Sequence, residues 1–349
     1  MRALWYLLAY LVPATAAVGV ALGGWWLLVT PLFIFALTPV MDQWIGLDVA
    51  NPDAAEEGAR GRNRLYDLVL RAWVPLQLSV LAAGLYVAAT RATPIEAAGL
   101  ALALGMMGGI GINVAHELCH RKARLDRALA EALLTSVHYA HFAVEHVHGH
   151  HKNVATPLDP ATARSGESVY GFVPRSVIGG WRSFWAIEGE LAGRKGYGAF
   201  DLRNRRLRYP LVWALLALAV GLGLGAVALG VFVVQGVIAF AMLEVINYLE
   251  HYGLERQETR PGRFERVQPH HSWNSAHRLS NWYLFGLPRH SDHHYLASRP
   301  YPVLRHHADA PQLPAGYATM FLVALVPPLW RAMMDPRVAA LRAVEAQDA

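Results

Sequence analysis

The sequence predicts an all-α integral membrane protein, with six transmembrane helices in three hairpins and a cytoplasmic, histidine-rich cap of helices and loops. Three observations predict this class. First, only 16% of the 349 residues are charged and 54% are hydrophobic, whereas a soluble domain carries about 25% charged residues. Second, the uncharged residues are concentrated in four long runs. Third, all 17 histidines lie after residue 115. This composition excludes intrinsic disorder, and the single Cys119 excludes a disulfide framework or a Cys-ligated iron–sulfur module.

The first two helices are expected in a run of 39 residues without a charge, at 3–41. A bilayer-spanning helix needs about 20 apolar residues, so this run can hold two helices joined by a tight turn. Gly23 and Gly24 are the natural place for that turn. We do not expect a cleaved signal peptide, because the apolar run continues into a second span instead of stopping at a small-residue cleavage site.

The other four helices follow from the remaining runs. Two uncharged stretches of 19 residues, at 72–90 and 97–115, each predict one helix, and a run of 35 residues at 209–243 predicts two. The glycines between 221 and 225 indicate the turn in the last run. The predicted organisation is four segments: transmembrane helices one to four in 1–115, a polar segment with the first histidine boxes in 116–208, helices five and six in 209–249, and a second polar segment with the remaining histidine ligands in 250–349.

Lysine and arginine predict the orientation in the membrane. With a cytoplasmic N-terminus, 30 of the 31 basic residues lie in cytoplasmic segments, and only Arg91 lies in a turn on the other side. Cytoplasmic loops of membrane proteins carry this excess of Lys and Arg. We therefore expect both termini and both histidine-rich segments to be cytoplasmic.

The histidines form four groups along the chain. The fourth and sixth predicted helices deliver His116 and His251 to the same membrane face. Neutral imidazole is the commonest nitrogen ligand for iron, zinc and copper. A single HxxxH pair is often two unrelated surface histidines, but four groups on one face predict a metal site. The groups are His116 with His120, the run from His146 to His151, His251, and His290 with His293 and His294.

About nine imidazoles exceed the three or four ligands that a zinc site needs. They suit two metals of higher coordination number, and without thiolate or bound-cofactor motifs they favour a pair of non-haem irons doing O₂ chemistry. Carboxylates beside the histidines are expected to accept the other ring N–H and fix its tautomer, or else only to solvate polar backbone. These carboxylates are Glu117, Glu145, Glu250 and Asp292.

The sequences around the histidines resemble the integral-membrane di-iron desaturases and hydroxylases, and most specifically the bacterial alkane 1-monooxygenase family. The similar segments are HELCHRK at 116–122, EHVHGHHKNVATPLDPAT at 145–162, NYLEHYGL at 247–254, and HHSWNSAHRLSN with LPRHSDHH between 270 and 294. The resemblance covers essentially the whole chain.

The resemblance implies nine histidine ligands for two iron ions. On matching positions they are His116, His120, His146, His150, His151, His251, His290, His293 and His294. His148 falls at a variable position of its box and is not expected to be a ligand. His141, His271 and His277 match family positions outside the ligand set, and we expect them to hydrogen-bond or to line a pocket.

The resemblance also implies the reaction, in which an n-alkane, O₂, two electrons and two protons give a 1-alkanol and water. The substrate would lie between the helices, and Leu32, Phe33 and Leu104 are expected to limit the length of its chain. Small residues in the fourth helix fit such a route, but they fit close helix packing equally well. Glu244, an ionisable residue in a predicted span, is expected to line the site or to reach the interface.

The electrons are expected to come from a separate protein. The resemblance implies a rubredoxin, itself reduced by an NAD(P)H-dependent reductase, and a bacterial cytoplasmic membrane as the location. Arg203, Arg205 and Arg206 are candidate docking charges, although the positive-inside bias alone also explains them. A nucleic-acid partner is not expected.

Three other functions remain open at this point. A sister hydroxylase, such as a xylene monooxygenase, would act on alkyl side chains of aromatic compounds. A fatty-acyl desaturase would share the histidine boxes but not the long flanking segments. A metal transporter would place polar ligands inside its helices, near the membrane midplane, whereas these histidines lie at the ends of the spans.

Overall fold

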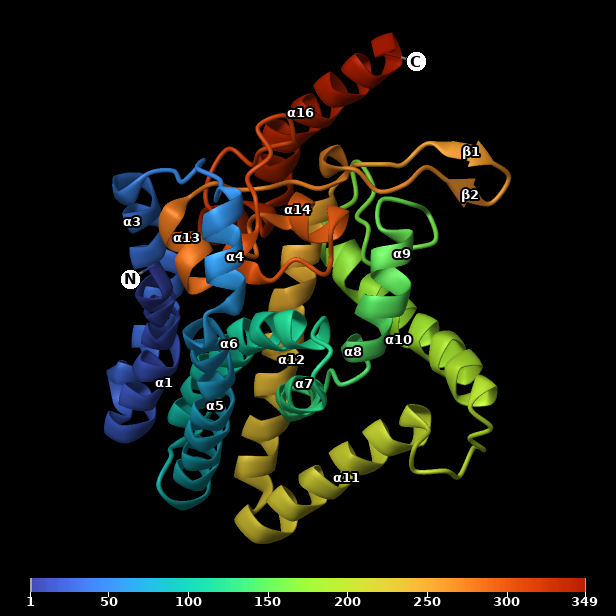
Figure 1. Ribbon diagram of the computed structural model, residues 1–349. Coiled ribbons are helices and arrows are strands. Elements are labelled where there is room, and N and C mark those ends of the chain that lie inside the picture. The colour runs from blue at the N-terminus through green and yellow to red at the C-terminus, as the bar shows by residue number, and fades with distance from the viewer. Residues whose placement is uncertain (1, 349) are drawn as a thin grey trace.

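The computed structural model describes residues 2–348, and most of them are helical (Figure 1). Within this range, six helices are long and apolar enough to cross a membrane, or seven if the bent pair Tyr317–Ala324 and Pro327–Val344 counts as one span. The expected six-helix membrane fold is therefore confirmed. The six spans are Ala3–Leu22, Gly24–Ile45, Arg64–Thr90, Pro94–Cys119, Arg205–Leu224 and Ala226–His251.

The first hairpin is built from short consecutive helices. Gly23 separates its two spans with a φ of +66°, which glycine adopts without steric cost, so the expected turn is confirmed. The span before it consists of η1 (Arg2–Tyr10) and α1 (Leu11–Leu22). The span after it consists of η2 (Gly24–Leu28), α2 (Val29–Leu32), the π-helical turn η3 (Phe33–Leu37) and α3 (Thr38–Ile45).

The second hairpin pairs α5 (Arg64–Thr90) with α6 (Pro94–Cys119), and the third pairs α11 (Arg205–Leu224) with α12 (Ala226–His251). Both α6 and α12 continue past their uncharged runs, so that His116 and His251 lie inside helices and not after them. The polar residues in the last turns of these two helices are buried in the cap. The end of an uncharged run therefore does not mark the end of the helix.

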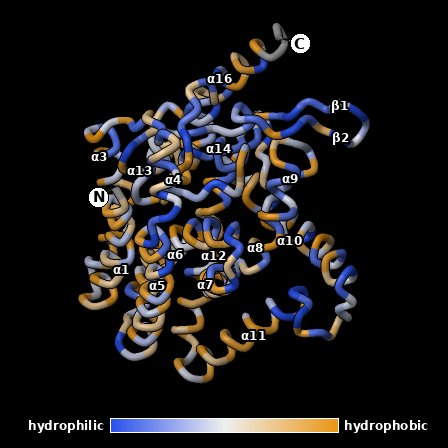
Figure 2. Tube along the Cα trace, viewed as in Figure 1, coloured by the Kyte–Doolittle hydropathy of each residue, from blue (hydrophilic) through white to orange (hydrophobic). Residues whose placement is uncertain are grey.

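At the centre of the bundle, α6 packs closely against α12. A Cβ atom on Gly105 of α6 would lie 2.7 Å from the Cβ of Ile238, closer than real Cβ atoms approach. By contrast, α11 runs at a steep angle to the other long helices (Figure 1). Only 6% of its most apolar stretch of 18 residues is buried within the protein. Apolar residues dominate this helix and the lower part of the bundle (Figure 2).

The polar segments form a cap at one end of the bundle, which is the more hydrophilic end in Figure 2. The expectation of helices and loops there misses one feature, a small antiparallel hairpin formed by β1 and β2. The cap elements are α4 (Ala54–Arg62), α7 (Arg124–Ser136), α8 (Phe142–Glu145), η4 (His146–His150), α9 (His151–Asn153), α10 (Val169–Arg194), β1 (Glu258–Arg260), β2 (Arg263–Phe264), η5 (Pro269–His271), α13 (Arg278–Tyr283), α14 (His290–Tyr295), η6 (Tyr301–Val303), α15 (Tyr317–Ala324) and α16 (Pro327–Asp348).

Candidate metal centre

Five elements deliver the nine histidines to one place in the cap. The last turn of α6 carries His116, His120 is the C-cap residue directly after it, and α12 ends at His251. The π-helical turn η4 and the adjoining α9 place three further histidines, and the short helix α14 places the last three. On α6 and α14 the spacings of three and four residues put the rings on one helical face.

These side chains form two clusters. In each cluster, the possible ligand atoms of all members lie within 4.8 Å of one another. The five-histidine cluster contains His116, His120, His146, His151 and His293. The four-histidine cluster contains His150, His251, His290 and His294. The clusters adjoin, because the rings of His151 and His294 have centroids 4.4 Å apart.

Within each cluster the Nε2 atoms face one another at short range. In the five-histidine cluster, the Nε2 of His146 lies 3.0 Å from that of His120 and 3.0 Å from that of His151. In the four-histidine cluster, the Nε2 of His294 lies 2.9 Å from that of His290 and 3.2 Å from that of His150. Nitrogen atoms that converge on a common centre in this way can hold a metal ion.

Burial keeps most of these imidazoles neutral, which is the form that binds metals. Burial lowers the pKa of His146, His293 and His294 well below the usual value, and the neighbouring histidines lower it further. Burial likewise lowers the pKa of His120 to about 4. For His150, burial also lowers the pKa, but the Asp159 carboxylate outweighs it, and the net shift is upward.

The residues present fit a metal. The Nε2 of His116 is buried and has no hydrogen-bond partner among the described residues, although buried polar atoms are normally paired. It points into the five-histidine cluster, where the other converging atoms are also imidazole nitrogens. A metal ion would pair this atom and would replace the unfavourable contacts between nitrogen lone pairs.

Asp159 supports the four-histidine cluster from behind. Its Oδ2 lies 2.9 Å from the Nδ1 of His150, so the ring N–H donates to the carboxylate and leaves Nε2 to face the cluster. Thr162 also donates to Oδ2, and the Ala161 N–H donates to Oδ1. Sequence reasoning missed this residue. Its signal was an aspartate before a proline within the second histidine box, nine residues after His150.

Of the four carboxylates expected to support ligands, only Glu250 lies beside a ligand ring. Its Oε1 lies 3.2 Å from the Nδ1 of His290 and accepts a hydrogen bond from the Tyr317 hydroxyl. The contact is one of proximity, because the Nδ1 of His290 has no hydrogen-bond partner among the described residues.

The other three carboxylates contact other groups. Glu117 pairs with Arg121, which lies just after the end of α6, and Glu145 accepts a hydrogen bond from Ser183. Asp292 accepts from Arg299 and His307 and so anchors the segment that follows α14. These bonds hold the three carboxylates in place, and their support of ligand rings stays a prediction.

Sequence similarity independently indicates the family. The fatty acid desaturase family model matches residues 93–324. Alkane 1-monooxygenase 2 of Pseudomonas aeruginosa is 42% identical over 347 residues, which cover 95% of this chain and 91% of that protein. Alkane 1-monooxygenase 2 of Alcanivorax borkumensis is 40% identical over 343 residues, or 97% of this chain and 90% of that protein.

The chain belongs to the alkane 1-monooxygenase family. A more partial match is the xylene/toluene monooxygenase hydroxylase component of Pseudomonas putida, which is 33% identical over 245 residues. That match covers 69% of this chain and 64% of the xylene/toluene protein.

In this member of the alkane 1-monooxygenase family, the three additional histidines lie around the clusters. His277 lies 2.8 Å from the Ser275 hydroxyl, and His141 is buried and lines a polar cavity. The Nδ1 of His271 accepts a hydrogen bond from the Gln268 N–H, so its Nε2 carries the proton and faces Glu265 at 3.3 Å. Although Glu265, His270 and His271 are close enough to hold an ion, this tautomer favours hydrogen bonding.

A narrow apolar cavity of about 50 Å³ lies between η3, α6, α12 and α15. Ile34, Phe35, Asn113 and Phe321 line it, together with Tyr317, which bonds Glu250 of the metal centre. Because Tyr317 connects the two, this cavity adjoins the four-histidine cluster. Its lining is almost entirely apolar, which suits contact with a hydrocarbon.

The three residues expected to set chain length do not line this cavity. Leu32 is 58% exposed, and its role in setting chain length stays a prediction. Leu104 is fully buried, and its methyl groups fill the space beside Gly84. Phe33 packs on the edge of the core, one residue before the cavity-lining Ile34.

The three candidate docking arginines all have partners. Arg203 pairs with Asp201, and Arg205 pairs with the buried Glu188. The Arg206 guanidinium lies 5.5 Å from the centre of the Trp185 ring. Arg205 therefore has a structural role. The side chain of Arg203 is the most exposed of the three, although it is ion-paired.

Proposed function

We propose that this protein is a membrane di-iron monooxygenase that hydroxylates the terminal methyl group of n-alkanes to 1-alkanols. The observation that carries the proposal is the convergence of nine histidines in two adjoining clusters, beside an apolar cavity. Near-full-length similarity to alkane 1-monooxygenases supports the same reaction.

The substrate determines what chemistry is needed. A terminal C–H bond has no polar handle, so general acid–base or nucleophilic catalysis cannot begin on it. Two non-haem iron ions held by the five-histidine and four-histidine clusters would supply the activation of O₂ and the oxidising power. Ring nitrogens suit iron, and nine of them leave coordination positions for an exogenous ligand.

The chain's own residues position the reaction. Asp159 orients His150 through its hydrogen bond to Nδ1, and Glu250 lies 3.2 Å from the Nδ1 of His290. The apolar cavity receives the hydrocarbon and excludes water from it, with Phe35 and Phe321 among its walls. A methyl group presented from this cavity would face the clusters while the rest of the alkane extends into the bundle.

Electrons would come from a separate rubredoxin, which an NAD(P)H-dependent reductase reduces. Exposed basic residues suit an acidic donor, and such docking weakens with salt because charges are screened beyond about 8–10 Å. Arg203→Glu and Arg206→Glu variants should slow donor-driven turnover without lowering iron content. Arg205 is left unchanged, because its reversal would place a second carboxylate beside the buried Glu188.

The protein is a multi-pass membrane protein, and we propose the bacterial cytoplasmic membrane with both termini and the metal centre on the cytoplasmic side. The asymmetry of Lys and Arg supports this orientation, with Arg91 as the single basic residue on the outer side.

Product analysis tests the function most directly. The chain, reconstituted in lipid with rubredoxin, reductase and NADH, is given octane, hexadecane or xylene under O₂. We expect 1-octanol or 1-hexadecanol and an iron content of two per chain. Products from xylene alone would favour the aromatic side-chain hydroxylase. An alkene product would favour a desaturase, and metal flux without O₂ consumption would favour a transporter.

A further inference from the structure

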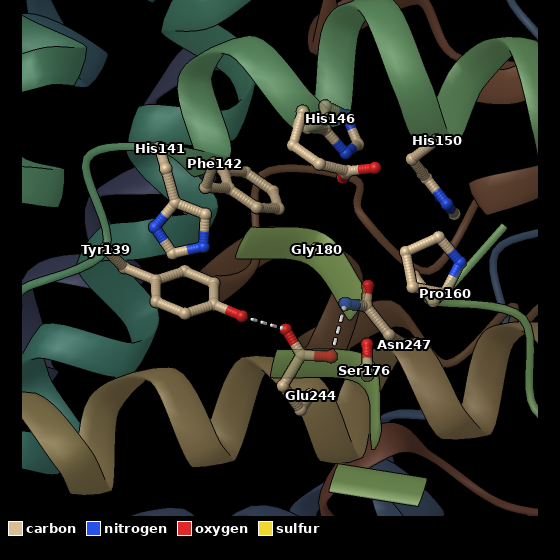
Figure 3. A pocket seen from close by; sticks show the side chains of 12 residues that line it. Tyr139, His141, Phe142, His146, His150, Pro160, Ser176, Gly180, Glu244 and Asn247 are labelled. Atoms are coloured by element: carbon tan, nitrogen blue, oxygen red, sulfur yellow. Dashed lines mark hydrogen bonds between the residues drawn. The ribbon is translucent and has the colours of Figure 1, made fainter. Parts of the chain in front are cut away.

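A small, buried polar cavity lies against both histidine clusters. Its volume is about 10 Å³, which is room for about one water molecule. His146 from the five-histidine cluster and His150 from the four-histidine cluster both line it (Figure 3). It shares no lining residue with the apolar cavity. Among the described residues that line it, two are glutamates and none is lysine or arginine.

One of these glutamates, Glu244, is held firmly in place. It is 2% exposed on α12, and Tyr139 donates to its Oε1 at 2.6 Å. Asn247 donates to its Oε2 at 3.3 Å, and Figure 3 shows both bonds at one edge of the cavity. Ionisable residues within a membrane span are costly to bury and are usually functional. The metal centre, as described above, does not use this carboxyl group.

His141 connects the polar cavity to a second one. It lines both the polar cavity and an open crevice of about 260 Å³, whose walls include Trp181, Tyr209 and Trp213. The side chain is 6% exposed, but its ring nitrogens are not among the fully buried polar atoms that lack a partner. A polar ring in so buried a position is favourable where water can reach and pair with it. The ring therefore marks a path for water between the crevice and the cavity.

We propose that Glu244 is the internal proton carrier of the oxygenase reaction, supplied by water that reaches the polar cavity past His141. The inference rests on the proposed function, because that reaction consumes two protons for every O₂. Tyr139 and Asn247 are positioning residues, which fix the carboxyl group at the cavity edge. Glu145 bonds Ser183 and has no part in the relay.

The proton balance is simple. The two electrons from the donor and two protons reduce one oxygen atom to water, while the other oxygen atom enters the alkanol hydroxyl group. For each proton, the O–H bond of the Glu244 carboxyl group breaks and the proton moves to water in the cavity. That water passes a proton on toward the cavity wall formed by His146 and His150. Water that enters from the crevice then reprotonates the carboxylate.

Glu244→Gln tests the proposal, because it keeps the size and the ability to accept from Tyr139 but holds no transferable proton. We expect normal iron content, a fall in kcat of about 10²-fold, and an enlarged ratio of rates in H₂O and D₂O. Alkanol formed per O₂ consumed should also fall. Gln235→Met is the matched control, since Gln235 is buried on the same helix but does not line the cavity; it should leave all four values near those of the wild type.

A second measurement does not depend on turnover. In infrared spectra of the resting, iron-loaded enzyme without donor, the band of a protonated carboxyl group should shift in D₂O and should be absent in Glu244→Gln. His141→Phe should slow that shift. Tyr139→Phe, which leaves the carboxyl group in place, should move the band, and it keeps the test available if Glu244→Gln does not fold.

Unchanged kcat, isotope effect and coupling in Glu244→Gln would overturn the proposal. So would a carboxyl band that neither Glu244→Gln nor Tyr139→Phe alters. If wild-type enzyme hydroxylates no alkane, the proposed function fails, whereas the rate of the D₂O shift with and without His141→Phe still decides whether water reaches Glu244.

Discussion

His148 and His150 lie two residues apart in the π-helical turn η4, but their surroundings differ. His150 is 2% exposed, faces the four-histidine cluster and bonds Asp159. The side chain of His148 is exposed and belongs to neither cluster. The widened turn places His146 and His150 inward, so neighbouring residues of one type have different roles.

This contrast gives a prediction at the residue scale. His150→Ala should reduce alkane turnover below detection and should lower the iron content, because it removes a proposed ligand. His148→Ala should leave both nearly unchanged. Iron analysis and product formation on the two purified variants measure this. Wild-type turnover and iron content in His150→Ala would contradict the ligand assignment.

At the scale of elements, the approach of α6 to α12 fixes the position of two ligand-bearing helix ends. Gly105 of α6 faces Ile238 and the backbone oxygen of Gln235, each less than 3.0 Å from where its Cβ would lie. A side chain there must move one helix away from the other. Because α6 carries His116 and α12 carries His251, such a movement would also separate ligands.

Gly105→Ala should therefore destabilise the fold by about 1–3 kcal/mol, the usual cost of overpacking. Gly230→Ala on α12 is the matched control, because nothing lies within 4 Å of its Cβ position; it should be neutral or stabilising by about 0.5–1 kcal/mol. Loss of monodisperse protein on heating in detergent measures both. Equal midpoints for the two variants would show that the close contact is not limiting.

The apolar cavity gives a second prediction at this scale. Phe321→Ala, at the contact between α15 and η3, should enlarge the cavity and shift preference toward longer n-alkanes. The ratio of rates for hexadecane and octane should rise about tenfold or more, since one methylene of pocket space is worth 10–200-fold. Iron content should stay constant.

Leu32→Ala is the control for this series, because Leu32 is exposed at the outer surface and does not line the cavity. Its chain-length profile should match that of the wild type. A shift in Leu32→Ala without one in Phe321→Ala would place the substrate along the outer helix face instead.

For the whole molecule, the distribution of charge predicts a single orientation in the bilayer. A periplasm-active reporter inserted between Ala92 and Thr93, in the short turn after Arg91, should be active. The same reporter fused after the last residue should be inactive, whereas a cytoplasm-active reporter there should work. Opposite activities would reverse the proposed orientation and would place the metal centre outside.

The sequence by itself determined the membrane class, the spans, the turns at Gly23 and Gly225, and the histidines that gather. These features depend on local composition and spacing, which the chain carries directly: uncharged runs set the helices, and histidines three and four residues apart share a helical face. Family resemblance supplied the full set of nine from the same boxes.

The tertiary structure decided the rest, because it depends on residues far apart in the chain. The division into five and four histidines, with His150 and His151 in different clusters, follows from how α6, η4, α12 and α14 meet. Three carboxylates lie beside ligands in the sequence but bind other groups in the structure. Glu117 binds Arg121, Glu145 binds Ser183, and Asp292 binds Arg299. Leu32 points outward for the same reason: hydrophobicity predicts that a residue lies in a membrane helix, but only helix packing decides whether it faces lipid or a cavity.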